Sequence, residues 1–163
     1  MELELGLELG FRPYPPFMPT LPTRRFGPVP IEEADIYRFP SGLPGFPGAS
    51  RFVLLPDPGG APFQWLQSAD KPELALVTCD PLLFAPDYRV EVKAEDLAPI
   101  GLADVANGFV LAILTVPSDP KLTTANPLGP LVFNPGTMQA RQLVLAKPVA
   151  FARVPVFGAA APC

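Results

Sequence analysis

The side chains of this 163-residue chain that could carry out chemistry are carboxylates, because the sequence contains no histidine and only two cysteines. Asp80, Asp87, Glu95 and Asp96 follow one another within one short stretch. Two converging carboxylates can supply the general acid and the nucleophile or base of a hydrolase. A carboxylate-dependent hydrolase is therefore one alternative, although acids on a protein surface are far more often simply solvated.

Most other catalytic chemistry is excluded by what the sequence lacks. Without histidine there is no Ser-His-Asp or Cys-His arrangement, and most types of catalytic zinc site are excluded as well. Cys79 has no partner at CxxC spacing, which excludes a thioredoxin-like motif. The run from Gly42 to Gly45 contains Pro44 and predicts a rigid turn in place of a phosphate-binding loop. We therefore expect no catalytic residue, no metal and no cofactor.

The composition predicts one compact all-β domain. There are 25 prolines and 13 glycines, and because proline costs about 3 kcal/mol inside a helix, long helices are excluded. Hydrophobic residues make up 48% of the chain and charged residues 17%, which favours a packed core over disorder. Short strands joined by many turns tolerate this density of proline and glycine.

The hydrophobic pattern predicts about eight short strands and one short helix. Residues 88–93 alternate between inward and charged side chains, and residues 109–116 are apolar on both faces, as expected of a central, covered strand. The helix is expected at Ala94–Leu97, stopped by Pro99. The other strands are expected at residues 51–55, 63–67, 74–78, 131–133, 142–145 and 149–154. This spacing is typical of an antiparallel β-barrel or sandwich, and a single β-barrel-like domain is predicted.

The two ends of the chain differ from the rest. Residues 1–22 are rich in proline and predict a disordered extension, although the alternation of residues 1–9 leaves an additional edge strand as an alternative. The β domain is expected over residues 23–157, and residues 158–163 are expected to form a flexible tail.

No segment of the sequence predicts export or a membrane. Acids stand near the N-terminus where a secretory signal carries basic residues. The longest apolar run, residues 109–114, is far shorter than the roughly 20 residues of a membrane helix. We expect a cytoplasmic protein with no membrane contact.

The charges are unevenly distributed along the chain. The net charge is −4, which argues against direct nucleic-acid binding through phosphate groups. All 16 acids lie in residues 1–119, and residues 120–163 hold bases only. The simplest interpretation is two solvated faces of opposite sign. The alternative is an acidic docking face for a basic partner.

Six blocks of the sequence resemble the FliW family of flagellar assembly factors. They begin with IYRFPSGLPGF at residues 36–46 and end with RQLVL at residues 141–145, in the family order and with near-family spacing. Between them stand PFQWLQS, ELALVTCDPLLFAPDY, AILTVP and TTANPLGPLVFN. One departure is Pro127, which stands where the family usually has leucine and which removes a backbone donor.

The resemblance implies a non-enzymatic protein with two partners. FliW-like proteins bind newly made flagellin, and they also bind the translational regulator CsrA and relieve its repression of flagellin translation. Competition between these partners is a switch that needs no chemistry. A structural adaptor without a regulatory partner is the remaining alternative. Family members usually begin shortly before the block matched by residues 23–27, so Met18 is expected as the native start in place of Met1.

Ten residues are candidates for partner binding. Trp65, Gln67 and Ser68 are expected to present polar groups beside apolar ones at a strand end, where flagellin would dock. Segment 80–104 is acidic and is expected to attract CsrA. For Trp65 a place in the core is the favoured alternative, and Asp80 and Asn126 could simply stabilise turns. The remaining candidates are Asp80, Phe84, Tyr88, Glu91, Glu95, Asp96 and Asn126.

Overall fold

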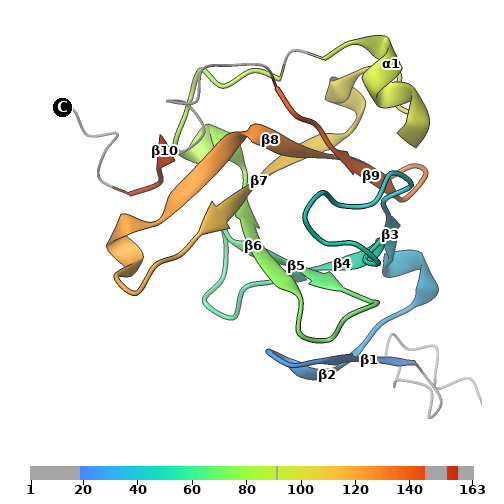
Figure 1. The fold of residues 1–163 in the computed structure, drawn as a ribbon, viewed down its shortest axis with the longest axis vertical. Helices are drawn as coiled ribbons and strands as arrows, with labels where there is room; N and C mark the ends of the chain where they lie inside the picture. Colours follow the sequence, from blue (N-terminus) through green and yellow to red (C-terminus); the bar gives the residue numbers. More distant parts are fainter. Residues whose placement is uncertain (1–18, 91, 146–153, 158–163) are drawn as a thin grey trace, which may run out of the picture.

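A closed β-barrel of seven strands forms the body of the protein (Figure 1). The computed structural model describes residues 19–90, 92–145 and 154–157. Each strand pairs with the next in the order β8, β7, β6, β5, β4, β3, β9, and a further pairing of β9 with β8 closes the ring. Among the pairings of the described strands, only that of β3 with β9 is parallel. The strand bounds are β3 Tyr37–Arg38, β4 Arg51–Pro56, β5 Gln64–Ser68, β6 Ala75–Cys79, β7 Phe109–Thr115, β8 Thr124–Asn134 and β9 Gln139–Gln142.

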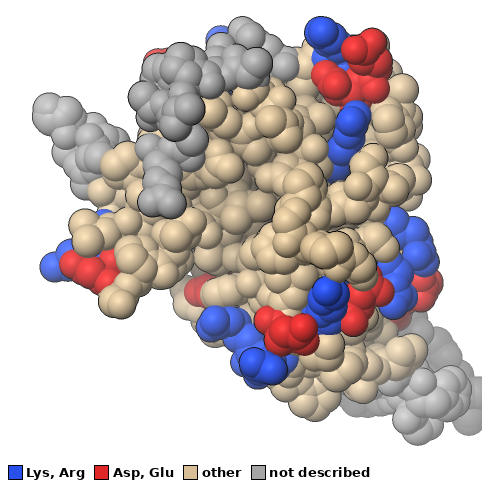
Figure 2. Space-filling model, in the orientation of Figure 1, with Lys and Arg blue, Asp and Glu red and all other residues tan. Residues whose placement is uncertain are grey.

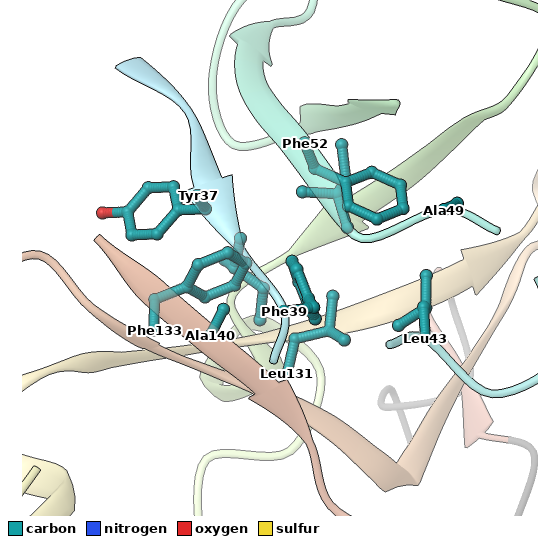
Figure 3. Packing of buried hydrophobic residues seen from close by; sticks show 10 residues of the cluster. Tyr37, Phe39, Leu43, Ala49, Phe52, Leu131, Phe133 and Ala140 are labelled. Atoms are coloured by element: carbon teal, nitrogen blue, oxygen red, sulfur yellow. The ribbon is translucent and has the colours of Figure 1, made fainter. Parts of the chain in front are cut away.

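Aromatic rings fill the interior of the barrel (Figure 3). Phe133 of β8 stacks on Phe109 of β7 with the ring centroids 4.8 Å apart, and Tyr37 of β3 meets Phe133 edge-on at 5.0 Å. Phe39 meets Phe52 of β4 edge-on at 5.1 Å. Each such pair contributes about 0.5–1.5 kcal/mol beyond its buried area, so these contacts stabilise the packing of strands that are far apart in sequence.

Short elements cover the outside of the barrel in three places: helix α1, the turn Pro81–Leu83 with strand β10, and the hairpin β1–β2. Leu97 of α1 packs in one cluster with Val132 of β8, and Leu21 of β1 packs in another with Val53 of β4. No helix among the described residues is long and apolar enough to cross a membrane. The bounds of these elements are α1 Ala94–Leu97, β10 Val154–Pro155, β1 Thr20–Thr23 and β2 Gly27–Pro30.

Strand β8 carries a wide bulge, residues 127–130, which we call the β8 bulge. The register with β7 jumps there, so that these four residues stand opposite the single residue Ala112. The side chain of Gln142 and the backbone N–H groups of Leu143 and Leu145 donate to three carbonyls of the bulge at 2.8 to 3.0 Å. Three carbonyls of the bulge are therefore bonded to the last residue of β9 and to the segment that follows it.

The predicted fold class is confirmed. The helix has the predicted bounds, Ala94–Leu97, and β4, β5 and β6 each begin and end within one residue of their predicted bounds. Strand β7 lies between β6 and β8, and it carries Leu111 in the interior cluster and Ala112 in an outer one, as expected of a strand covered on both faces.

Other predictions about strands are wrong. The described residues of segment 88–93 form no strand, because no described strand pairs with them. The segment is held instead by the hydroxyl of Tyr88, which donates to the carbonyl of Pro127 at 2.6 Å. Strand β9 begins at Gln139 and ends at Gln142, so it shares only Gln142 with the strand predicted at residues 142–145.

Some boundaries also differ from the predictions. Strands β1, β2 and β3 were not predicted, and β1 begins at Thr20, within the segment predicted as an extension. The strand predicted at residues 149–154 lies outside the described residues except for its last position, where β10 begins.

Gly108, immediately before β7, leaves no room for a side chain. A Cβ atom at this position would lie 2.1 Å from the carbonyl oxygen of Phe133, which the β7–β8 ladder fixes. We expect Gly108→Ala to lower the free energy of unfolding by at least about 2 kcal/mol in urea denaturation.

Gly136→Ala is the control for this substitution. The nearest atom to its Cβ is the side-chain oxygen of Asn134 at 3.2 Å, so the cost should stay below about 1 kcal/mol. Equal stability of Gly108→Ala and the wild type would contradict the close approach.

Candidate functional site

Trp65 on β5 is held by three neighbours and is half-buried. Its indole N–H donates to the carboxylate of Asp57 at 2.7 Å, and the guanidinium of Arg25 lies 4.3 Å from the ring centre. Phe26 meets the ring edge-on at 5.8 Å. These contacts join the β1–β2 turn to the β4–β5 turn, so Trp65 has a structural role whether or not its exposed part meets a partner.

Gln67 and Ser68 are both 0% exposed, so the expectation that they present polar groups on the surface is wrong. The amide of Gln67 donates to three carbonyls of the β5–β6 turn at 3.0 to 3.3 Å. The hydroxyl of Ser68 accepts the backbone N–H groups of Asp70 and Lys71 at 3.0 and 2.8 Å. Both side chains satisfy backbone groups of one turn, and in this conformation neither can contact a partner.

Asp70 ties the same turn to the start of β4. Its carboxylate accepts the backbone N–H groups of Ser50 and Arg51 at 2.9 and 3.0 Å and the guanidinium of Arg51 at 3.0 Å. Partial burial alone would raise the pKa of Asp70, but these donors and the charge of Arg51 lower that pKa below its ordinary value.

In the segment after β6, the candidates Asp80 and Phe84 both make structural contacts. The carboxylate of Asp80 accepts the N–H of Leu82 at 2.9 Å and so begins the turn Pro81–Leu83. Phe84 is buried in one cluster with Cys79 and therefore presents no ring to a partner. Burial, together with the charge of Asp80, raises the pKa of the Cys79 thiol to about 11, so this thiol is protonated and a poor nucleophile near neutral pH.

Tyr88 and Asn126 both stabilise the β8 bulge. Burial raises the pKa of Tyr88 to about 12, so the hydroxyl keeps the proton that it donates to Pro127. The side-chain oxygen of the exposed Asn126 accepts the N–H of Leu128 at 3.0 Å, which is the turn-stabilising alternative.

The described acids of segment 80–104 do not all lie at one place. Asp80 lines a pocket of about 450 Å³ beside β7, Glu95, Asp96 and Asp104 line a groove that adjoins it, and Asp87 lines neither. Glu91 lies outside the described residues. Basic side chains stand beside acidic ones at the corner formed by α1 (Figure 2). The described acids are thus divided between two neighbouring hollows of the surface.

The groove that Glu95 and Asp96 line has a volume of about 980 Å³, and we call it the β9 groove. One wall is formed by residues 141–145, which follow and include the end of β9, and the other by residues around α1. The sequence predicted a strand at residues 142–145 but did not indicate that a groove would lie along it. The charged residues that line the groove are Arg89, Lys93, Glu95, Asp96, Asp104 and Arg141.

These features define a small closed β-barrel with a groove along one strand. Within the described residues, no three Cys, Asp or Glu side chains are grouped so that they could hold a metal ion. The chain belongs to the FliW family, whose model, described as FliW protein, matches residues 20–156. The resemblance of the sequence blocks is thereby confirmed.

Similar proteins support the assignment. A protein of Geobacter sulfurreducens named flagellar assembly factor FliW is 43% identical over 123 residues, which cover 76% of this chain and 77% of that protein. The protein of the same name from Moorella thermoacetica is 38% identical over 124 residues, covering 76% and 78%. A crystal structure of the flagellar assembly factor FliW matches with a TM-score of 0.78 at 30% identity, over 85% of this chain and 97% of that one.

Asp70 provides a test of the electrostatics in the β5–β6 turn. A carboxylate with a depressed folded-state pKa stabilises the fold above its unfolded-state pKa of about 3.9, and this contribution is lost as the pH falls through the folded-state value. We expect Asp70→Asn to lower the melting temperature at neutral pH by roughly 2–4 °C, the shift for about 1 kcal/mol in a domain of this size. The difference should shrink below about pH 4.

Differential scanning calorimetry between pH 7 and pH 3 measures this difference. Glu73→Gln is the matched control, because Glu73 is exposed and accepts no hydrogen bond from a described residue. A difference between Asp70→Asn and the wild type that stays constant over this range would contradict the role of the ionised carboxylate.

Proposed function

We propose that this protein is a flagellar assembly factor that acts in the cytoplasm by binding newly made flagellin and the translational regulator CsrA in turn. Membership of the FliW family carries the proposal, because relatives named flagellar assembly factor match about three quarters of both chains. The match to 97% of a solved FliW chain adds support, since the barrel corresponds to that structure nearly throughout.

The proposed mechanism is partner switching by mass action. While flagellin is bound, the protein is not available to CsrA, and CsrA represses flagellin translation. Secretion of flagellin then frees the protein, which binds CsrA and relieves the repression. Such a switch needs only one protein shared between two ligands, and it requires no catalysed step.

The proposed CsrA contact lies on the acids of segment 80–104, because CsrA is a basic RNA-binding protein. Several of these acids are already engaged: Asp96 accepts the N–H of Lys93 at 3.0 Å, and Asp104 accepts that of Ala106 at 2.9 Å. Glu95 is exposed on α1 and accepts no hydrogen bond from a described residue. Glu95 is therefore the acid best suited to meet a basic partner without cost to the fold.

Recovery of the partners tests the proposed function. The tagged full-length protein is incubated with a lysate of its own cells, and bound proteins are identified by mass spectrometry. We expect flagellin and CsrA, and we expect added flagellin to displace CsrA from the purified complex. Recovery of neither by a folded protein would contradict the proposal, and stable binding of flagellin without CsrA would favour an adaptor without a regulatory partner.

Glu95→Lys should slow association with CsrA. Charges at the rim of an interface act chiefly on the association rate, and salt screens them within about 8–10 Å at physiological ionic strength. We expect the rate constant to fall roughly threefold to tenfold at low salt, with a smaller difference at high salt, in stopped-flow measurements.

Glu73→Lys makes the same change in net charge at a different place. Glu73 is exposed in the β5–β6 turn, on the side of the hairpin β1–β2 and away from α1 (Figure 1). This control should alter the association rate less than about twofold. Equal slowing by both variants would mean that net charge, and not the surface around α1, attracts CsrA.

A further inference from the structure

Among the described residues, the end of β9 and the three residues after it are hydrogen-bonded to a neighbouring strand along one edge only. Leu143 and Leu145 donate their backbone N–H groups to carbonyls of the β8 bulge at 2.9 and 2.8 Å. Because successive residues of an extended strand direct their N–H and C=O groups to opposite sides, those of Gln142 and Val144 point away from β8. Strand β3 occupies that side only at Gln139, and no other described strand pairs there. We call residues 142–145 the open edge.

Within the part of the chain that the structure describes, the open edge carries none of the usual protection against strand pairing. Sheet edges are commonly protected by charged residues, by proline or by a covering element. The outer strands β2 and β10 of this protein both contain proline. The open edge has the sequence QLVL, with neither proline nor charge, and its Val144 is 82% exposed. An unprotected, uncharged edge is a ready template for one more strand.

The β9 groove has room for a single extended segment beside this edge. Its volume is about 980 Å³, and its apolar lining includes Val90, Val105 and Leu143. A second copy of the chain would bring a folded barrel behind its own edge strand, and residues around α1 form the opposite wall of the groove. A lone polypeptide segment has no such bulk behind it.

The charges of the groove also favour a polypeptide of mixed composition. Three basic and three acidic residues line it, so it attracts neither a polyanion nor a polycation strongly. Backbone groups at the open edge, valine and leucine side chains along the walls and charges of both signs match the chemistry of an extended amphipathic segment.

We propose that the open edge binds an extended amphipathic segment of a partner protein, which adds to the barrel as a strand. Main-chain hydrogen bonds to Gln142 and Val144 would supply affinity, and the apolar lining would select alternate side chains. The inference rests on the proposed function, in which unassembled flagellin is the partner with an unburied amphipathic segment. It replaces the surface near Trp65 as the docking place, because Gln67 and Ser68 are buried.

Val144→Pro tests the backbone contact directly. The substitution removes the N–H that points away from β8 and leaves the N–H groups of Leu143 and Leu145 free to bond to the β8 bulge. Val144→Ala is the matched control, because it removes two methyl groups and keeps the N–H. We expect Val144→Pro to weaken binding of purified, unassembled flagellin at least about tenfold, and Val144→Ala less than about threefold, by isothermal titration calorimetry.

Amide hydrogen exchange by NMR adds a readout at single residues. Flagellin should protect the amides of Gln142 and Val144 in the full-length wild-type protein. If Val144→Pro proves unfolded by circular dichroism, Val144→Lys takes its place, because a charge at an edge position discourages strand addition while the backbone stays intact. The same loss of at least about tenfold is expected.

The outcomes separate the inference from the proposed function. Wild-type binding of flagellin together with undiminished binding by the folded Val144 variants would overturn the inference and leave the function standing. Protection of these amides by CsrA in place of flagellin would overturn the assigned occupant. A wild-type protein that binds neither partner would contradict the proposed function, and the inference would fail with it.

Discussion

The carbonyl groups of the β8 bulge must find hydrogen-bond donors that β7 does not supply, since four residues of β8 stand opposite one of β7. A buried carbonyl without a donor costs about 1–3 kcal/mol. Each of the four has a donor from elsewhere: the hydroxyl of Tyr88, the side-chain amide of Gln142 and the backbone N–H groups of Leu143 and Leu145. The bulge thereby fixes two segments that would otherwise be free loops.

The outer surface around α1 follows from these bonds. The hydroxyl of Tyr88 is bonded to the bulge, so the residues after Tyr88 run along the outside of the barrel. There Val90 and Val92 pack in one cluster with Leu97 of α1. Leu143 and Leu145 direct their N–H groups to the bulge and belong to the same cluster. The backbone groups of their neighbours Gln142 and Val144 point away from β8, and both residues line the groove. The groove and its open edge are thus consequences of which groups donate hydrogen bonds to the carbonyls of the bulge.

Elements that depend on local sequence signals were predicted correctly. Features that depend on pairing between segments far apart in the sequence were not. Helix Ala94–Leu97 was found because Pro99 stops it nearby. The alternation of residues 88–93 correctly marked Val90 and Val92 as inward-facing, but a strand also needs a partner, and none is present in the described structure. Gln67 was expected to be exposed because it is polar. In the structure its side chain is buried, because its amide donates to three backbone carbonyls of the β5–β6 turn. The open edge depends on which strands pair, which no local pattern reveals.

The β9 groove also brings together the two contacts that the proposed switch needs. Glu95, the proposed contact for CsrA, and Val144, on the proposed edge for flagellin, line the same groove. A strand added at the edge would occupy space that CsrA needs in order to approach α1, so competition would be steric and would need no conformational change. The two affinities would still be independently adjustable. Charges around α1 act mainly on the association rate of one partner, whereas backbone pairing and apolar contacts act mainly on the dissociation rate of the other.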